Sequence, residues 1–475
     1  MPGITVGDIG PKLSTNDNDN GFLRFDRVRI PRRQMLMKHT QLGADGTLSR
    51  RGPEKASYAT MTRVRASIVM VAGVSLSDAV TIALRFAAVR RQEPGAEPEL
   101  ERPILDYVSV QHLLLPVLAD AYALRFVGQH MMQMYQQLER QVRAEDYSLN
   151  AIAHATSCAL KSYCTTLGAD GIIECQRSCG GHAFHQFSGL PELYGKYMPL
   201  FTAEGNNWLL TQQTSRFLLK LLHGNSSVAG ASYLSPQSRR DLSAASSALS
   251  SLAHLSCLHR LAAVFERRCL WLLTSTHAAM QDAASPGGDP FSEDVFLKFL
   301  VEHYNISKAH AQATTLRAFI NAIEHCSKPH PTPSSHGGGS DSSSDFDRGF
   351  DFDGRSLVNV LTLLCRLFAL STIDRELGGL LLAGCLDVAT AAHIKPTLKS
   401  LLAQLRPVAI PLVDAFASTD WELNSALGRW DGDYVGTLYK WAQDNPLNKN
   451  QASLGGGPLL PGFEEHLRPI MVAKL

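Results

Sequence analysis

Long amphipathic segments in the first half of this 475-residue chain constrain its fold more than any other feature. Apolar residues recur at helical spacing in four of them. Pro116 is expected to interrupt or kink the second segment, and Gly180 to cap the C-terminal end of the third. Four helices with apolar stripes predict an antiparallel bundle. The segments are residues 57–91, 107–143, 148–179 and a run that follows Glu204.

Composition indicates a folded intracellular protein. Apolar residues make up 45% of the chain and charged residues 19%, and a net charge of +1 gives no electrostatic reason to expect a nucleic-acid partner. Nine cysteines without a CxxC pair favour reduced thiols over a disulfide framework or a zinc site, so no metal is predicted. The apolar run 66–89 carries Asp78 and Arg85, which favours a buried helix, and we predict no transmembrane segment.

Glu204 is the candidate catalytic residue. Asn206 and Asn207 follow it and are candidates to cap the helix beyond. The helix dipole would lower the pKa of Glu204, whereas burial beside Phe201 and Trp208 would raise it. Such a carboxylate can stay ionised and still accept a proton. On spacing alone, a carboxylate that merely answers the helix dipole remains the alternative.

The stretch 179–220 resembles the catalytic signature of peroxisomal acyl-CoA oxidases, flavoenzymes related to acyl-CoA dehydrogenases. The family writes this signature approximately as CGGHGY, then TFEG[DE]NT, then QT[AS]RFL. The chain keeps 179–182 (CGGH), 188–191 (SGLP), 204–205 (EG), Asn207 and 213–218 (QTSRFL). It departs from the family pattern at Ala183, Phe184, Ala203, Asn206 and Trp208.

The resemblance implies a role for each matching position. Glu204 would remove the α-proton of a fatty acyl-CoA while a hydride leaves the β-carbon for FAD. Molecular oxygen would then reoxidise the flavin, giving H2O2 and a trans-2-enoyl-CoA. Arg65 and Gly205 correspond to substrate-binding positions. The positions that correspond to FAD contacts across a homodimer are Arg90, Gln92, Gly180 and Gly181.

The resemblance continues to both ends of the chain and implies a mainly α fold. Residues 425–448 resemble the closing motif of the family, and the first residues resemble the end of its middle β-domain. Residues 22–30 alternate like a half-buried strand. We therefore predict two helical-bundle domains after a short β remnant. The predicted boundaries are 1–45 for the remnant, 46–225 for the first helical domain, 226–240 for a linker and 241–475 for the second helical domain, with a disordered insert at 328–353.

Location and completeness follow from the same comparison. The end Ala473-Lys474-Leu475 matches the peroxisomal C-terminal address, so a peroxisomal import receptor is an expected partner. The family's N-terminal helical domain and most of its β-domain have no counterpart here. We therefore expect the isolated chain to bind FAD poorly and to have little activity.

Two other functions remain open from the sequence. One is an acyl-CoA dehydrogenase that passes electrons to a flavoprotein carrier, which oxygen uptake would distinguish. The other is a non-catalytic dimerisation or regulatory subunit built from the helical half, which replacement of Glu204 would distinguish.

Overall fold

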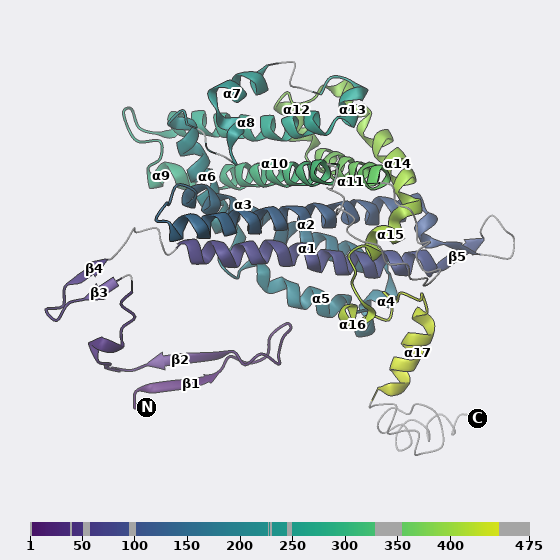
Figure 1. Cartoon of the computed structure of the whole chain (residues 1–475), viewed down its shortest axis with the longest axis horizontal. Coiled ribbons are helices and arrows are strands. Elements are labelled where there is room, and N and C mark those ends of the chain that lie inside the picture. The colour runs from purple at the N-terminus through teal and green to yellow at the C-terminus, as the bar shows by residue number, and fades with distance from the viewer. Residues whose placement is uncertain are drawn as a thin grey trace, which may run out of the picture.

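The computed structural model describes residues 2–38, 40–50, 58–94, 101–226, 228, 230–244, 249–327 and 354–445. Most of this chain is helical, which confirms the predicted mainly α fold (Figure 1). The predicted insert 328–353 and the C-terminal Ala473-Lys474-Leu475 lie outside the described residues. The strands are β1 (Ile4–Asp8), β2 (Gly21–Phe25), β3 (Thr40–Leu42), β4 (Leu48–Arg50), β5 (Arg91–Pro94) and β6 (Glu101–Pro103). The helices are α1 (Tyr58–Val89), α2 (Val108–Arg143), α3 (Asn150–Ser178), α4 (Gly181–Phe184), α5 (Leu190–Tyr197), α6 (Asn207–His223), α7 (Pro236–Ser243), α8 (Leu258–Ala283), α9 (Glu293–Phe296), α10 (Leu300–Cys326), α11 (Gly354–Arg375), α12 (Leu377–Leu382), α13 (Val388–Ala392), α14 (Ile394–Leu405), α15 (Ala409–Asp414), α16 (Asp420–Leu423) and α17 (Tyr434–Asp444).

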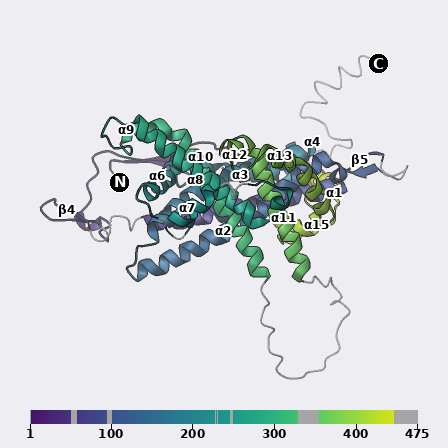
Figure 2. The same cartoon turned by 90° about the horizontal axis from the view of Figure 1, so that it is seen from above.

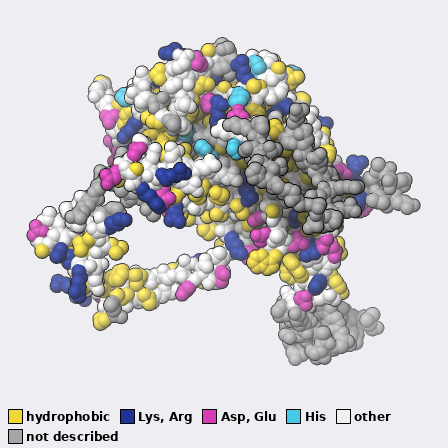
Figure 3. All heavy atoms as spheres, viewed as in Figure 1, with side chains coloured by type: hydrophobic (Ala, Val, Ile, Leu, Met, Phe, Trp, Pro, Cys, Tyr) yellow, Lys and Arg dark blue, Asp and Glu magenta, His cyan; other side chains and the backbone are white. Residues whose placement is uncertain are grey.

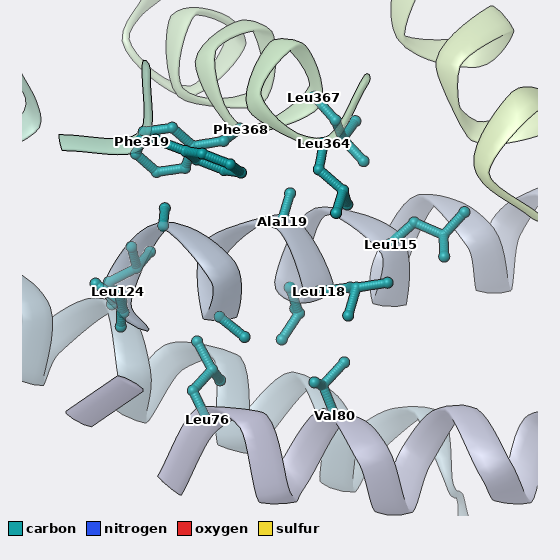
Figure 4. Close-up of a cluster of buried hydrophobic side chains, with 14 of the residues drawn as sticks. Leu76, Val80, Leu115, Leu118, Ala119, Leu124, Phe319, Leu364, Leu367 and Phe368 are labelled. Carbon is teal, nitrogen blue, oxygen red and sulfur yellow. The ribbon is translucent and has the colours of Figure 1, made fainter. Parts of the chain in front are cut away.

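Helix α2 lies at the centre of the molecule, between two layers of helices. Leu76 and Val80 of α1 pack on one side of it, and Phe319 of α10 and Phe368 of α11 pack on the other (Figure 4). Small residues let the helices approach closely: a Cβ at Gly73 would lie 2.9 Å from the backbone N of Arg125. Helices α1, α2, α3 and α6 form the predicted bundle, with α2 antiparallel to α1, as the views in Figures 1 and 2 show.

The later helices pack directly onto this bundle. Helix α10 contacts α2, α3 and α6, and one apolar core runs from residues of α1 to residues of α15. Within the predicted linker 226–240, Tyr233 and Leu234 are buried, and the Tyr233 hydroxyl lies 2.9 Å from Nδ1 of His310. This segment therefore packs on the core, and the predicted domain boundaries remain a prediction.

The N-terminal strands differ from the expected half-buried strand. Strands β1 and β2 form an isolated antiparallel ribbon beside the bundle (Figure 1), and every residue of β2 is exposed. The strand ends at Phe25 instead of Ile30. Apolar side chains gather on this ribbon in Figure 3, among them Val6, Leu23 and Phe25. The alternating pattern predicted the strand. It carries no information on whether a second layer covers that strand, and among the described residues none does.

Short-range sequence signals predicted one helix end correctly, whereas another helix end and a proline inside a helix differ from the prediction. Gly180 has φ of 60° and directly follows Cys179, the C-cap residue of α3, which confirms the predicted glycine at this helix end. Helix α3 begins at Asn150, after Leu149 and without a side-chain cap, so it starts two residues later than the expected segment 148–179. Helix α2 continues through Pro116, because packing on both faces outweighs the lost hydrogen bond.

All nine cysteines are free, and seven of them are buried.

Three helices are long and apolar enough to cross a membrane by length and composition. They are Met61–Val89, Val108–Arg143 and Leu357–Arg375. In their most apolar windows, 67%, 67% and 56% of the residues are buried inside the protein. Contact with other helices thus accounts for much of their apolar composition, as expected for a buried core helix at 66–89.

Buried histidines should make the protein sensitive to acid. Burial lowers the pKa of His303 and of His310 to about 4, and both side chains are fully enclosed. Between these pKa values and the ordinary value near 6.5, the unfolded chain binds protons that the folded chain does not, so stability falls as the pH falls. We expect His310 alone to contribute a loss of about 2 kcal/mol between about pH 7 and pH 5.

Urea unfolding at the two pH values measures this loss. The His310→Gln variant is the matched comparison, because it keeps a polar side chain but removes the titrating ring. A smaller change in its unfolding free energy between the two pH values is expected. An unchanged pH dependence in this variant would contradict the role of His310.

Candidate active site at the Glu204 turn

Glu204 lies in a tight turn between Phe201 and the start of α6. Its φ is 57°, and the following Gly205 has φ of 112°. The Asn206 side chain accepts a hydrogen bond from the backbone N–H of Trp208 at 2.9 Å, which confirms it as the N-cap of α6. Two successive left-handed residues thus reverse the chain and place the carboxylate just before a helix N-terminus.

A buried lysine holds this turn in place through hydrogen bonds. Lys161 of α3 is fully enclosed, and its Nζ donates to the backbone oxygens of Phe201 at 3.1 Å and Gly205 at 2.7 Å. It also donates to Oδ1 of Asn207 at 2.9 Å. Burial, with a smaller contribution from the charge of Arg65, lowers the pKa of Lys161 to about 8. One cation therefore ties both sides of the turn to α3.

Asn207 does not cap α6, although the sequence made it a candidate. It is the first residue of the helix and is buried. Its Nδ2 donates to Oγ1 of Thr165 at 2.9 Å, while its Oδ1 accepts from Lys161. The side chain therefore anchors the start of α6 to α3.

Arg65 lies beneath the same turn. Its Nε donates to the backbone oxygen of Glu204 at 3.1 Å, and its Nη1 lies 3.3 Å from Sγ of Cys158. Only 3% of the residue is exposed. Arg65 therefore holds the backbone that carries Glu204. Little of its guanidinium surface is accessible, and its assignment to substrate binding stays a prediction.

Gly205 is required by the geometry of the turn. An added Cβ would lie 2.8 Å from Cδ2 of Leu210, in a backbone conformation that side chains disfavour. We expect Gly205→Ala to lower the unfolding free energy by about 1–3 kcal/mol. Gly378→Ala is the control, since a Cβ there meets nothing within 4 Å. Equal urea midpoints for the two variants would contradict this requirement.

The surroundings of Glu204 differ from the predicted enclosure. Glu204 is exposed, and Trp208, 53% exposed, stacks on Tyr304 of α10 with ring centroids 4.6 Å apart. Glu204 does not line the cavity among α2, α3, α11 and α14 or that among α2, α11 and α15. The expected burial beside Phe201 and Trp208 is therefore wrong for the described residues. In this turn residue 204 is exposed, and the indole of Trp208 stacks on Tyr304 of α10.

A second cluster lies at the far end of α1. Arg90 follows the helix, and its Nη1 donates to the Tyr434 hydroxyl at 3.1 Å. The rings of Phe86, His182 and Tyr434 make mutual edge contacts, with centroids 5.2–5.8 Å apart. Gly180 directly precedes α4, which carries His182. The structure thus brings Arg90 near the Gly180–Gly181 turn, with Tyr434 between them. The sequence did not single out Tyr434.

Open space surrounds the two glycines of this cluster. A Cβ at Gly180 or Gly181 would meet nothing within 4 Å. Gln92 lies on β5, which pairs with β6, and its backbone oxygen accepts from the Tyr107 hydroxyl at 2.9 Å. Its side chain is exposed. The arrangement leaves room for an extended anionic group to approach the backbone of the two glycines and a guanidinium.

The two sequence motifs meet at this end of the bundle. Ser425 Oγ donates to the backbone oxygen of Ser188 at 2.6 Å, and Arg85 donates to the backbone oxygen of Gly428 at 2.9 Å. Arg85 also pairs with Asp414 at 2.8 Å. The C-terminal motif therefore packs against the CGGH–SGLP segment, which is more than 230 residues away in sequence.

The Glu204 turn and the Arg90 cluster are far apart. Arg65 lies near the first and Val89 next to the second, and α1 spans roughly 36 Å between them at about 1.5 Å per residue. The two clusters therefore cannot contact a single reacting centre.

Comparisons with known proteins identify the class to which this fold and turn belong. The family model "Acyl-CoA oxidase, C-alpha1 domain" matches residues 58–219, and the model "Acyl-CoA oxidase" matches residues 257–472. These matches place the helices among the C-terminal helical domains of acyl-CoA oxidases.

Individual relatives agree. Peroxisomal acyl-coenzyme A oxidase 1 of Arabidopsis thaliana is 35% identical over 489 residues, covering 100% of this chain and 67% of that protein. The rat protein of the same name is 32% identical over 475 residues, covering 99% and 67%. The chain belongs to the acyl-CoA oxidase family and corresponds to the C-terminal portion of its relatives, about two thirds of their length.

Solved structures show the same likeness. The structure of Arabidopsis thaliana acyl-CoA oxidase 1 has a TM-score of 0.85 and 34% identity, covering 100% of this chain and 67% of that one. Acyl-CoA oxidase-2 of Caenorhabditis elegans, solved with FAD, ascaroside-CoA and ATP, has a TM-score of 0.81 and 30% identity, covering 100% and 65%. The family resemblance of the sequence is thereby confirmed.

Proposed function

We propose that this chain supplies the catalytic base and part of the flavin site of an acyl-CoA oxidase in peroxisomal fatty acid β-oxidation. The observation that carries the proposal is the Glu204 turn. A carboxylate matching the family's base stands at a helix N-terminus, and Lys161 and Arg65 hold its backbone in place. A residue that only balanced a helix dipole would not need two buried cations beneath it.

In this proposal Glu204 takes the α-proton of the acyl-CoA. Its exposed side chain can reach a substrate that binds on this face, and a surface that covers the substrate would exclude water from the site. When bound, FAD would supply the acceptor for the β-hydride and the group that reacts with oxygen. The products would be trans-2-enoyl-CoA and H2O2. Gly205 would let the substrate approach the turn, and Arg65 would act through the position of Glu204.

The cofactor proposal depends on the second cluster. Arg90, Gln92, Gly180 and Gly181 fit a phosphate-bearing group, because a guanidinium lies near open backbone. Since this cluster lies roughly 36 Å from Arg65 along α1, we propose that it contacts the FAD of a second subunit. This proposal implies a homodimer in which the Arg90 cluster of each subunit contacts the FAD of the other. Peroxisomal location is proposed from the names of the relatives and from Ala473-Lys474-Leu475.

The experiment tests peroxide formation with the flavin site completed. The chain is joined to the preceding third of Arabidopsis thaliana acyl-CoA oxidase 1, and this joined protein is loaded with FAD beside the 475-residue chain alone. We expect the joined protein to hold flavin and to form H2O2 from a saturated acyl-CoA, and the chain alone to do so weakly.

Two outcomes would contradict the proposal. Turnover with an artificial electron acceptor but without oxygen uptake would indicate a dehydrogenase. A joined protein that holds FAD but is not reduced by acyl-CoA would favour a non-catalytic helical subunit.

A further inference from the structure

We propose that the cavity among α2, α11 and α15, here called the Arg125 cavity, binds a single-chain amphiphilic carboxylate. The cavity has a volume of about 510 Å³. None of its lining residues belongs to the Glu204 turn or to the Arg90 cluster. Apolar and aromatic side chains form most of its wall, including Tyr122, Phe126, Leu361, Val408, Pro411 and Phe416.

Arg125 is the cationic side chain among the residues that line this cavity. It is half-buried, and its guanidinium lies over the ring of Phe416, 5.6 Å from the centroid. Within the described ranges, it makes no hydrogen bond and no ion pair. The nearby carboxylate Asp78 accepts a hydrogen bond from the Ser418 hydroxyl at 2.8 Å, and it interacts with Arg125 through its charge without a direct ion-pair contact. A half-buried guanidinium that lacks a hydrogen-bonded carboxylate gains from an anionic ligand that supplies one.

The chemistry of the wall limits the ligand. The Tyr122 hydroxyl donates to the backbone oxygen of Leu412 at 2.8 Å. This donor is therefore already used, and Tyr122 offers a ligand its aromatic ring. Gln129 at the rim adds one amide. A polyanion such as a nucleotide would leave charges unpaired against aromatic and aliphatic walls, and a neutral hydrocarbon would leave the guanidinium unpaired. One carboxylate with an aliphatic chain satisfies both parts of the cavity.

Calorimetric titration with decanoate tests the proposal on the 475-residue chain. The probe is added below its aggregation concentration, without flavin or acyl-CoA, so the result is independent of the proposed oxidase activity. We expect saturable binding at one site per chain. Decyltrimethylammonium, which carries the opposite charge, and acetate, which lacks the aliphatic chain, should bind at least about tenfold more weakly.

Variants separate the two parts of the site. Arg125→Gln should weaken decanoate binding at least about tenfold, and Arg125→Lys should retain most of it. Ala415→Phe, a substitution at an exposed lining residue, should fill the cavity and remove binding. Arg140→Gln, on the same helix but outside the cavity, should leave the affinity unchanged. Thermal unfolding of each variant checks that it folds.

Three results would overturn the proposal. The first is the absence of saturable decanoate binding. The second is equal affinity of the wild-type and Arg125→Gln proteins. The third is a wild-type chain that does not bind decanoate but self-associates in light scattering, with Ala415→Phe dispersing the oligomer. That result would make the cavity an interface between copies.

Discussion

Replacing Lys161 with methionine is expected to lower the unfolding free energy by about 3 kcal/mol or more, because it leaves three buried or partly buried acceptors without their donor. The acceptors are the backbone oxygens of Phe201 and Gly205 and the side-chain oxygen of Asn207. Methionine has a similar length, so the loss reports hydrogen bonds and charge rather than volume. The Glu204 turn should loosen, and the proposed activity should fall with it.

Urea unfolding measures this effect. Lys196→Met is the matched control, because Lys196 is an exposed lysine whose one ion pair among the described residues is with Glu192 on the same helix. Its effect should be within about 0.5 kcal/mol. If the Lys161 and Lys196 variants unfold at the same midpoint, the lysine does not support the turn.

Replacing Glu204 with glutamine is expected to lower the turnover of the flavin-loaded joined protein by about 10²–10⁴-fold, the usual contribution of a positioned general base. Glutamine keeps the size of the side chain but cannot accept the α-proton. Binding of acyl-CoA should change little, because the backbone of the turn is held by Lys161 and Arg65 rather than by the carboxylate.

Glu145→Gln provides the control for this change. Glu145 is also an exposed glutamate with a left-handed backbone, with φ of 59° against 57° for Glu204. A general effect of removing such a carboxylate would therefore appear in both variants. Peroxide formation by the Glu204→Gln protein at the wild-type rate would exclude the catalytic role.

Periodicity was sufficient to predict the main helices and the bundle. Helix α1 was expected at 57–91 and spans Tyr58–Val89, and its apolar stripe packs on neighbours from Ala66 to Ala88. The Asn206 cap was also predictable, since its partner Trp208 is two residues away. Signals that depend on contacts within one turn of the chain are present in the sequence itself.

Support of the site could not be predicted, because it depends on contacts between distant segments. In the sequence Lys161 looks like an ordinary helix residue, because its contacts with residues 201–207 arise only in the folded chain. Tyr434 lies 344 positions from its partner Arg90. The burial of Glu204 was predicted wrongly for the same reason. The apolar neighbours Phe201 and Trp208 are adjacent in sequence, but Trp208 packs on Tyr304 of a later helix.

The central claim is that Glu204 removes the α-proton. Anaerobic incubation of the flavin-loaded joined protein with a saturated acyl-CoA in D2O, followed by mass spectrometry of the acyl group, measures α-hydrogen exchange directly. The account predicts exchange by the wild-type protein and at least about 10²-fold slower exchange by the Glu204→Gln protein with acyl-CoA still bound. Exchange at the wild-type rate in that variant would contradict it.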